Sequence, residues 1–257
     1  MTANILFPRD FDTSKIVVSK YQKQKDSASG NVRIKYAFED SESTDRLIIQ
    51  SARMRIPFGI TNNEKYSKEG DQLKWDIRCS FDGEEKNKKI QKFRECIDKF
   101  DDFIIAEAIK NSEEWLNDDD ADEKSIKKSY KSALKKFKPK KEKPEQVYSD
   151  TFKINIPWDY EKNAPSSSVE FYDDNGNETD WTNVTPGCEI IALFSISGIW
   201  CSPGINSFGV STKLVQLQIF KPKKIKGFNI KYDVDCDSEK ESEDELSEVE
   251  NNDGEAE

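Results

Sequence analysis

The chain contains no histidine among its 257 residues. Histidine is the usual general base, the commonest zinc ligand and the partner of Ser and Cys nucleophiles, so sites built on these arrangements are excluded. An enzyme that uses carboxylates, lysine or a metal held by Asp and Glu is left open, but it is disfavoured. Cysteine is also sparse, with five widely spaced residues and no Cys-x-x-Cys motif. This spacing predicts reduced thiols in an intracellular setting.

Long apolar runs are missing as well. None approaches the ~20 residues that a helix needs to span a bilayer, so the sequence predicts a soluble protein. Hydrophobic residues make up 35% of the chain and charged residues another 35%. This is less apolar and more charged than an average globular protein, so we expect a modest core with part of the chain outside it.

Negative charge is concentrated at one end of the chain. Residues 233–257 hold thirteen acidic residues and one lysine, a net of −12, so the −10 of the whole chain leaves +2 for residues 1–232. The segment has too few apolar side chains to offset chain entropy, and we expect residues 228–257 to be a disordered acidic tail. A mildly basic body joined to an acidic tail favours nucleic acid or a basic protein as partner.

Two hydrophobic periods divide the rest of the chain. Alternation on every second position predicts half-buried strands in four segments, 32–38, 53–58, 73–79 and 152–156. Steps of three and four residues predict an amphipathic helix over 85–116 and a second helix over 125–137. The apolar run 188–200, the loop 201–206 and the segment 210–220 together predict a long hairpin, while Gly198 and Gly209 indicate a kink and a close approach of backbones.

The order of strands, helices and further strands predicts a mainly β, α+β fold. A partly open barrel of the OB-fold type has this order, and a β-sandwich with an inserted helical pair is the competing architecture. We expect a loose N-terminal arm over 1–30, an OB-fold-like DNA-binding domain over 31–227 that carries the helical insertion 85–137, and the disordered tail.

Basic residues on the polar phase of the strands could form one cationic strip if these strands pair with one another. Single-stranded DNA is bound by such strips together with aromatic rings on which its bases stack. We predict phosphate contacts for six residues, Arg53, Arg55, Lys74, Arg78, Lys153 and Lys213. We predict base stacking for three residues in or beside loops, Trp158, Trp200 and Phe208. A solvated strand face and hydrophobic plugs are the plainer interpretations, and for the ten lysines of 124–143 a solvated helix and linker is favoured.

The remaining motifs give little support to a catalytic or metal-binding function. Asp118, Asp119 and Asp120 could bind Mg²⁺ but equally cap a helix, and Asp173 and Asp174 belong to a turn. There is no phosphate loop and no nucleophile elbow. The sequence therefore predicts no catalytic residue, no metal and no cofactor. A structural or interaction protein without DNA binding, such as a virion component or an acidic-tail chaperone, is the alternative function, and an Mg²⁺-dependent nuclease is a third.

Several segments resemble the single-stranded DNA-binding proteins of large eukaryotic DNA viruses, a class related to those of short-tailed phages. The resemblance covers most of residues 30–227 and is carried by five segments, 53–60, 111–116, 152–154, 196–200 and 208–211, together with the acidic tail. It implies an OB-fold that coats single-stranded DNA during replication and recombination, and a tail that docks on replication enzymes. The phage tails end in an aromatic residue, whereas residues 253–257 here read Asp-Gly-Glu-Ala-Glu, a departure that weakens the case for contact with a polymerase.

The function predicted from the sequence is binding of single-stranded DNA without sequence preference, in viral DNA replication, recombination and repair. The predicted partners are single-stranded DNA and, through the tail, a polymerase or helicase, with no membrane contact and a homodimer as an open alternative. The predicted location is the host cytoplasm or a viral replication compartment, with packaging in the virion also open.

Overall fold

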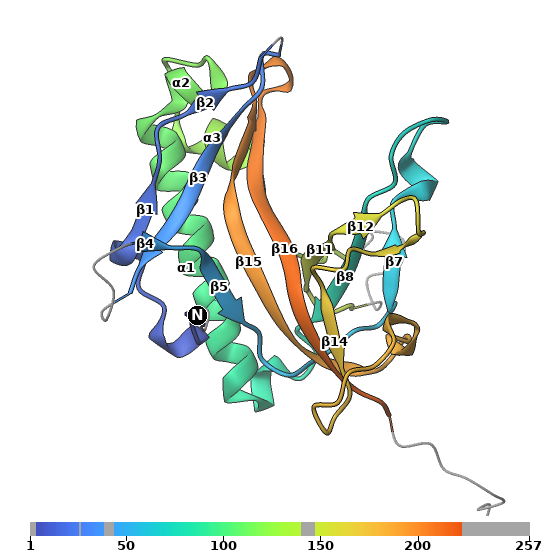
Figure 1. The fold of residues 1–257 in the computed structure, drawn as a ribbon. Coiled ribbons are helices and arrows are strands. Elements are labelled where there is room, and N and C mark those ends of the chain that lie inside the picture. The colour runs from blue at the N-terminus through green and yellow to red at the C-terminus, as the bar shows by residue number, and fades with distance from the viewer. Residues whose placement is uncertain (1–3, 26, 39–43, 140–146, 223–257) are drawn as a thin grey trace, which may run out of the picture. The chain divides into compact units, whose positions relative to one another are not determined.

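Two long strands, β15 (Glu189–Ser202) and β16 (Ser207–Phe220), pair antiparallel and form the centre of the main sheet (Figure 1). The pairing runs from Glu189 opposite Phe220 to Ser202 opposite Ser207, and a short 3-10 turn closes the loop between the strands. Because every residue of β15 except Glu189 is buried or half-buried, its sequence reads as the most apolar stretch of the chain. The predicted hairpin is confirmed.

The structure is a computed structural model that describes residues 4–25, 27–38, 44–139 and 147–222. The chain divides into two units, Met1–Pro222 and Lys223–Glu257, and the second unit, with the predicted acidic tail, lies outside the described residues. The helices are α1 (Lys88–Lys110), α2 (Ser112–Leu116) and α3 (Glu123–Ser129). The other strands are β1 (Ile16–Val18), β2 (Gln22–Lys23), β3 (Gly30–Ala37), β4 (Thr44–Asp45), β5 (Leu47–Gln50), β6 (Met54–Arg55), β7 (Ile60–Asn62), β8 (Trp75–Ser80), β9 (Tyr130–Lys131), β10 (Leu134–Lys135), β11 (Thr151–Ile156), β12 (Trp158–Asp159), β13 (Ala164–Pro165) and β14 (Glu170–Tyr172).

The main sheet has the strand order β1-β3-β15-β16-β11-β8-β7, and within the described residues its two outer strands do not pair with each other. The sheet is therefore open. Short strands pair with its members at several points, and β12 and β13 form a separate small hairpin. The predicted fold class, mainly β with a few helices and an OB-fold-like, partly open arrangement, is confirmed.

Helix α1 covers one face of the sheet (Figure 1). It begins where the Asn87 side chain accepts hydrogen bonds from the backbone N–H groups of Lys89 and Ile90, which would otherwise be unsatisfied. Its buried stripe repeats at three- and four-residue steps, and Phe93 contacts the rings of Phe152 and Phe194 on the sheet. Fully burying one such side chain stabilises the fold by ~1.5–3 kcal/mol. The predicted helix over 85–116 is thus present, divided into α1 and α2.

The predicted second helix over 125–137 is wrong in its second half. Helix α3 ends at Ser129, and the chain then continues as β9 and β10. The spacing of Ile126, Tyr130 and Leu134 fits a helix, but β9 pairs with β16 and β10 pairs with β11. Unpaired edges of β16 and β11 offer backbone hydrogen bonds that local periodicity does not reveal, so the tertiary pairing overrides the local pattern.

The interpretation of residues 1–30 as a loose arm is also wrong for the described part. Residues 4–25 contain two 3-10 turns and the strands β1 and β2, which pair with β3. Leu6, Phe11 and Ile16 are buried, and the Phe11 ring contacts the rings of Tyr36 and Phe100. These apolar residues follow no regular period because each lies in or beside a different short element, so their role in the core is not visible in the sequence pattern.

Four cysteines in the described residues are buried and free, namely Cys79, Cys96, Cys188 and Cys201. Burial raises the pKa of the Cys79, Cys96 and Cys201 thiols to about 12. These three side chains therefore stay protonated at neutral pH and act as small apolar core residues.

Candidate nucleic-acid interface

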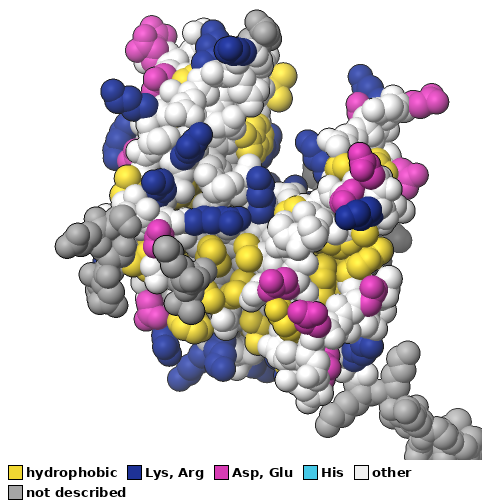
Figure 2. Space-filling model, in the orientation of Figure 1, with side chains coloured by type: hydrophobic (Ala, Val, Ile, Leu, Met, Phe, Trp, Pro, Cys, Tyr) yellow, Lys and Arg dark blue, Asp and Glu magenta, His cyan; other side chains and the backbone are white. Residues whose placement is uncertain are grey.

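A groove of about 760 Å³ opens between the β15–β16 hairpin and the neighbouring strands β11, β8 and β12. Figure 2 shows a hollow on this face, with Lys and Arg side chains at its base and hydrophobic side chains beside them. Among the residues that the structure describes, the lining contains four lysines, four large aromatic residues and no acidic residue; these eight are Lys74, Lys131, Lys153, Lys213, Trp75, Trp158, Tyr160 and Trp200. We refer to it as the tryptophan groove.

The floor of the tryptophan groove forms where β11 meets β16. The two strands run parallel and share a single register pair, Asn155 opposite Lys213. The Asn155 amide donates a hydrogen bond of 3.0 Å to the Thr212 carbonyl, and the Thr212 hydroxyl donates one of 3.1 Å to the Lys153 carbonyl. These side-chain bonds replace part of the missing ladder and hold the lysines of the two strands side by side.

The four lysines of the tryptophan groove carry uncompensated charge. Among the described residues, none of them forms an ion pair with a carboxylate. Three of them are exposed, and Lys153 is half-buried in β11. Because the described lining also lacks acids, the positive potential of these lysines adds up instead of cancelling, an arrangement whose charge is complementary to a polyanion.

Two of the tryptophans form a stack on one side of the groove. The Trp75 and Trp158 rings lie 3.9 Å apart between centroids at an angle of 11°, and Trp181 meets Trp158 edge-on at 5.5 Å. Both stacked rings are half-buried. Trp75 begins β8 and Trp158 follows β11, so the antiparallel pairing of Trp75 with Ile156 brings the two rings together. The stack presents a rigid aromatic surface with few rotamers to lose on binding.

The third tryptophan, Trp200, lies on the hairpin opposite Gly209. A Cβ atom at Gly209 would come within 2.6 Å of the Lys131 carbonyl oxygen and 2.8 Å of the Trp200 ring, which is closer than atoms pack. Glycine therefore allows both β9 and the indole ring to lie directly on the backbone of β16. The predicted close approach at Gly209 is confirmed, and Gly198 similarly lies against the Val32 carbonyl next to an irregularity in the β15–β16 register.

Lys131 is positioned from beneath by a carboxylate on α1. Asp101 accepts hydrogen bonds from the hydroxyls of Tyr130, at 2.6 Å, and Ser132, the residues on either side of Lys131. Burial raises the pKa of the Asp101 carboxyl, and the two hydrogen bonds oppose this rise only in part. Burial and the neighbouring Asp101 raise the pKa of Tyr130 well above its ordinary value. The Asp101 contacts fix the backbone of β9, so the exposed Lys131 projects from a rigid edge of the groove.

The raised pKa of Asp101 predicts a pH-dependent contribution to stability. The folded state holds the proton more tightly than the unfolded chain, so this contribution is present below the ordinary Asp pKa of about 4 and is lost as pH rises through the raised pKa. Asp101→Asn removes the titration. The difference in the free energy of unfolding, wild type minus variant, should therefore decrease between acid and neutral pH in urea titrations. Parallel pH profiles of the two proteins would contradict this prediction.

No cluster of three or more side chains suited to a metal ion occurs in the ranges that the structure describes. Asp173 instead accepts hydrogen bonds from the backbone N–H groups of Asn175 and Asn177, which is the predicted turn. The cap of α3 is Asp122, whose side chain accepts from the Ser125 N–H, and not one of the three preceding aspartates. None of the helices in the described ranges has the length and apolar character needed to cross a membrane.

No family model and no curated protein matches the chain. Among solved structures, the chain is similar to gp2.5, a single-stranded DNA-binding protein encoded by bacteriophage T7. The two are 12% identical, the match covers 72% of this chain and 97% of that one, and the TM-score is 0.44. It is also similar to the single-stranded DNA-binding protein from bacteriophage Enc34 in complex with single-stranded DNA, with 12% identity, 80% and 97% coverage and a TM-score of 0.39.

The structure brings together five of the nine residues that the sequence singled out. Lys74, Lys153 and Lys213 lie in the tryptophan groove with Trp158 and Trp200. Arg78 is not in its lining but in that of an adjoining hollow, and its Nε is 3.2 Å from an Asp76 carboxylate oxygen. The contacts of these predicted residues with nucleic acid stay predictions.

Arg53 and Arg55 lie outside the groove. The Arg53 guanidinium contacts Glu189 at 2.7 Å and lies 3.9 Å from the centroid of the Phe220 ring, while Arg55 is 4.0 Å from Asp82. Strand β6 pairs with the beginning of β15 and lies near the C-terminal end of β8. Lys74 directly precedes the N-terminal end of β8, so it is at the other end of that strand. Alternation showed which residues leave the core, but it did not show with which strand β6 pairs.

Phe208 does not reach the groove. Its side chain is fully buried, with 0% exposure, and it packs against the rings of Trp115 and Tyr130. The expectation that it stacks a base is corrected here, because the loop 203–206 folds as a tight turn and returns Phe208 directly to the core. Conversely, two groove residues are missing from the predicted set: Trp75, which shares the apolar phase of the segment 73–79 and is therefore expected in the core, and Lys131, one lysine in a run of ten.

Proposed function

We propose that the chain binds single-stranded DNA in the tryptophan groove without sequence preference. The observation that carries this proposal is the meeting, within the described residues, of four lysines without ion pairs and the rings of Trp75, Trp158 and Trp200 in one groove whose lining has no acidic residue. Lysines hold phosphates, and aromatic rings stack bases of any identity, whereas the bases of a duplex are already stacked on each other. The role is binding, with no chemical step.

We further propose that this binding serves the replication, recombination and repair of viral DNA, with a polymerase or helicase contacted through the acidic segment 228–257. This setting is supported by the resemblance to viral single-stranded DNA-binding proteins and by the charge of the segment. The segment lies outside the described residues, so its role is argued from composition alone.

A fluorescence titration tests the proposed binding directly. Three of the five tryptophans line the groove while Trp115 is buried, so bound bases should quench a large part of the emission. We expect quenching by single-stranded oligonucleotides that weakens steeply as salt is raised, and much weaker quenching by a duplex of equal length. Unchanged emission, together with no retention of a labelled oligonucleotide at low salt, would overturn the proposal and favour the interaction-protein alternative.

A further inference from the structure

A second hollow of about 460 Å³ adjoins the tryptophan groove. The two share four lining residues, Lys131, Ser132, Ala133 and Lys153, so the hollows meet at these residues. The second hollow lies along β10 and the adjoining part of β11, and we refer to it as the β10 hollow.

The β10 hollow is also lined by cations, and no acidic residue stands among its described lining residues. It adds Arg78, Lys135 and Lys136 to the lysines that it shares with the first groove. Arg78 lies opposite Lys153 in the register of β8 and β11, but its charge is partly neutralised by Asp76. Lys135 and Lys136 are exposed and form no ion pair within the described residues, so they supply the uncompensated charge.

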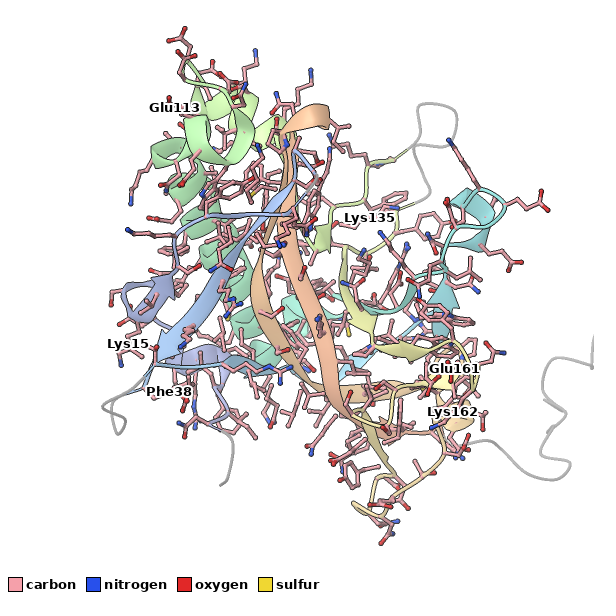
Figure 3. The ribbon with its side chains drawn as sticks, turned by 45° about the horizontal axis from the view of Figure 1, so that its top comes forward. Lys15, Phe38, Glu113, Lys135, Glu161 and Lys162 are labelled. Atoms are coloured by element: carbon pink, nitrogen blue, oxygen red, sulfur yellow. The ribbon has the colours of Figure 1, made fainter. Side chains whose placement is uncertain are left out.

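The register of β10 and β11 sets the direction of this extension. Lys135 pairs with Thr151, two residues before Lys153, which is roughly 7 Å along a strand. Figure 3 shows Lys135 between the β15–β16 hairpin and the strands β11 and β8, whereas Glu113 and Glu161 lie elsewhere. The cationic lining therefore continues from the tryptophan groove past Lys153 toward Lys135.

The two hollows differ in their aromatic lining. Tyr130 is the single aromatic residue in the described lining of the β10 hollow, which holds no tryptophan, and the hydroxyl of that ring donates a hydrogen bond to Asp101. A polyanion in this hollow would thus meet positive charge without an indole surface for its bases.

We propose that a bound single strand continues past the tryptophan groove into the β10 hollow, where Lys135 and Lys136 hold its phosphates without stacking its bases. This inference rests on the proposed function and adds a second subsite to it. It gives the protein two modes of contact, base stacking with charge in the first groove and charge alone in the second. Short single-stranded oligonucleotides use the tryptophan groove only, and longer ones use both hollows.

The test compares the double variant Lys135→Ala/Lys136→Ala with wild-type protein on two oligonucleotides. These are about 5 and about 20 nucleotides long, the first near the lower end of the usual range of sites on one OB-fold, about 4–16 nucleotides, and the second above that range. We expect the affinity for the short strand to stay within twofold. We expect the affinity for the long strand to fall about tenfold, and its salt slope to fall by roughly 1.4, or 0.7 for each lost phosphate contact.

The matched control is Lys124→Ala/Lys128→Ala. Both residues belong to the same lysine-rich segment, are exposed on α3 and line neither hollow, so this variant loses the same charge without touching the subsite. An equal loss in both variants, an unchanged affinity for the long strand, or equal losses for short and long strands would each overturn the second subsite. Wild-type protein that binds neither strand would overturn the proposed function and this inference with it.

Discussion

Replacing Lys74 and Lys213 together by alanine should weaken the binding of single-stranded DNA by roughly tenfold or more at moderate salt, and should lower the salt slope by roughly 1.4. Both side chains are exposed, line the tryptophan groove and form no ion pair within the described residues. Their loss removes two sources of counterion release, and it leaves no buried partner unsatisfied. The free energy of unfolding should therefore change little, and fluorescence titrations at several salt concentrations measure the rest.

Arg53→Ala and Arg55→Ala provide the control for this experiment. Both remove one exposed positive charge, but their partners Glu189 and Asp82 lie outside the groove. We expect a small change in affinity and an unchanged salt slope. If the arginine variants lost as much binding as the lysine variant, the strip predicted from the sequence would be correct and the tryptophan groove would not be the site.

Trp158→Ala should weaken binding by roughly 5- to 150-fold, because stacking one base on an aromatic ring is worth ~1–3 kcal/mol. The ring is half-buried at the edge of the groove and is held parallel to Trp75. Since any base has a face to stack, the loss should be similar for oligonucleotides of different sequence. Trp200→Ala should have a similar effect from the opposite wall.

Conservative variants separate stacking from folding. Trp158→Phe keeps an aromatic face and should recover most of the binding that Trp158→Ala loses. Phe208→Leu changes a fully buried ring that contacts Trp115 and Tyr130, so it should lower the free energy of unfolding without changing the affinity of the folded protein. If Phe208→Leu weakened binding as strongly as Trp158→Ala at equal folded fraction, the assignment of Trp158 to the groove wall and of Phe208 to the core alone would be wrong.

Local patterns in the sequence predict the individual strands and helices of this fold better than they predict which strands pair with each other. A period of two appears in β3 and β11 because one side of each strand faces the core, and a period near 3.6 appears in α1 for the same reason. Pairing is decided by contacts between residues far apart in the chain. The pairing of β9 with β16 converts half of an apparent helix into strand.

The same limit explains which site residues could be foreseen. Lys74 and Lys153 share a groove because β8 pairs with β11. Arg55 has the same strand pattern in the sequence, but the pairing of β6 with β15 places it outside the groove. Trp75 lies in an apolar phase, which made the core its expected place, yet its strand begins at the rim of the sheet and leaves the ring half-buried. The sequence predicts that the candidate site combines positive charge with aromatic rings, but it does not predict which residues line that site.

The absence of a side chain at Gly209 couples two parts of the groove that, under the proposed function, would contact different parts of a nucleotide. The Lys131 segment and the Trp200 ring both rest on this position, one offering charge and the other an aromatic face. A single methyl group here would push outward on both at once, so the distance between charge and ring is set by the bare backbone of β16. Any larger residue at position 209 would require the cation and the indole to move together, which makes this glycine the common reference point of the binding surface.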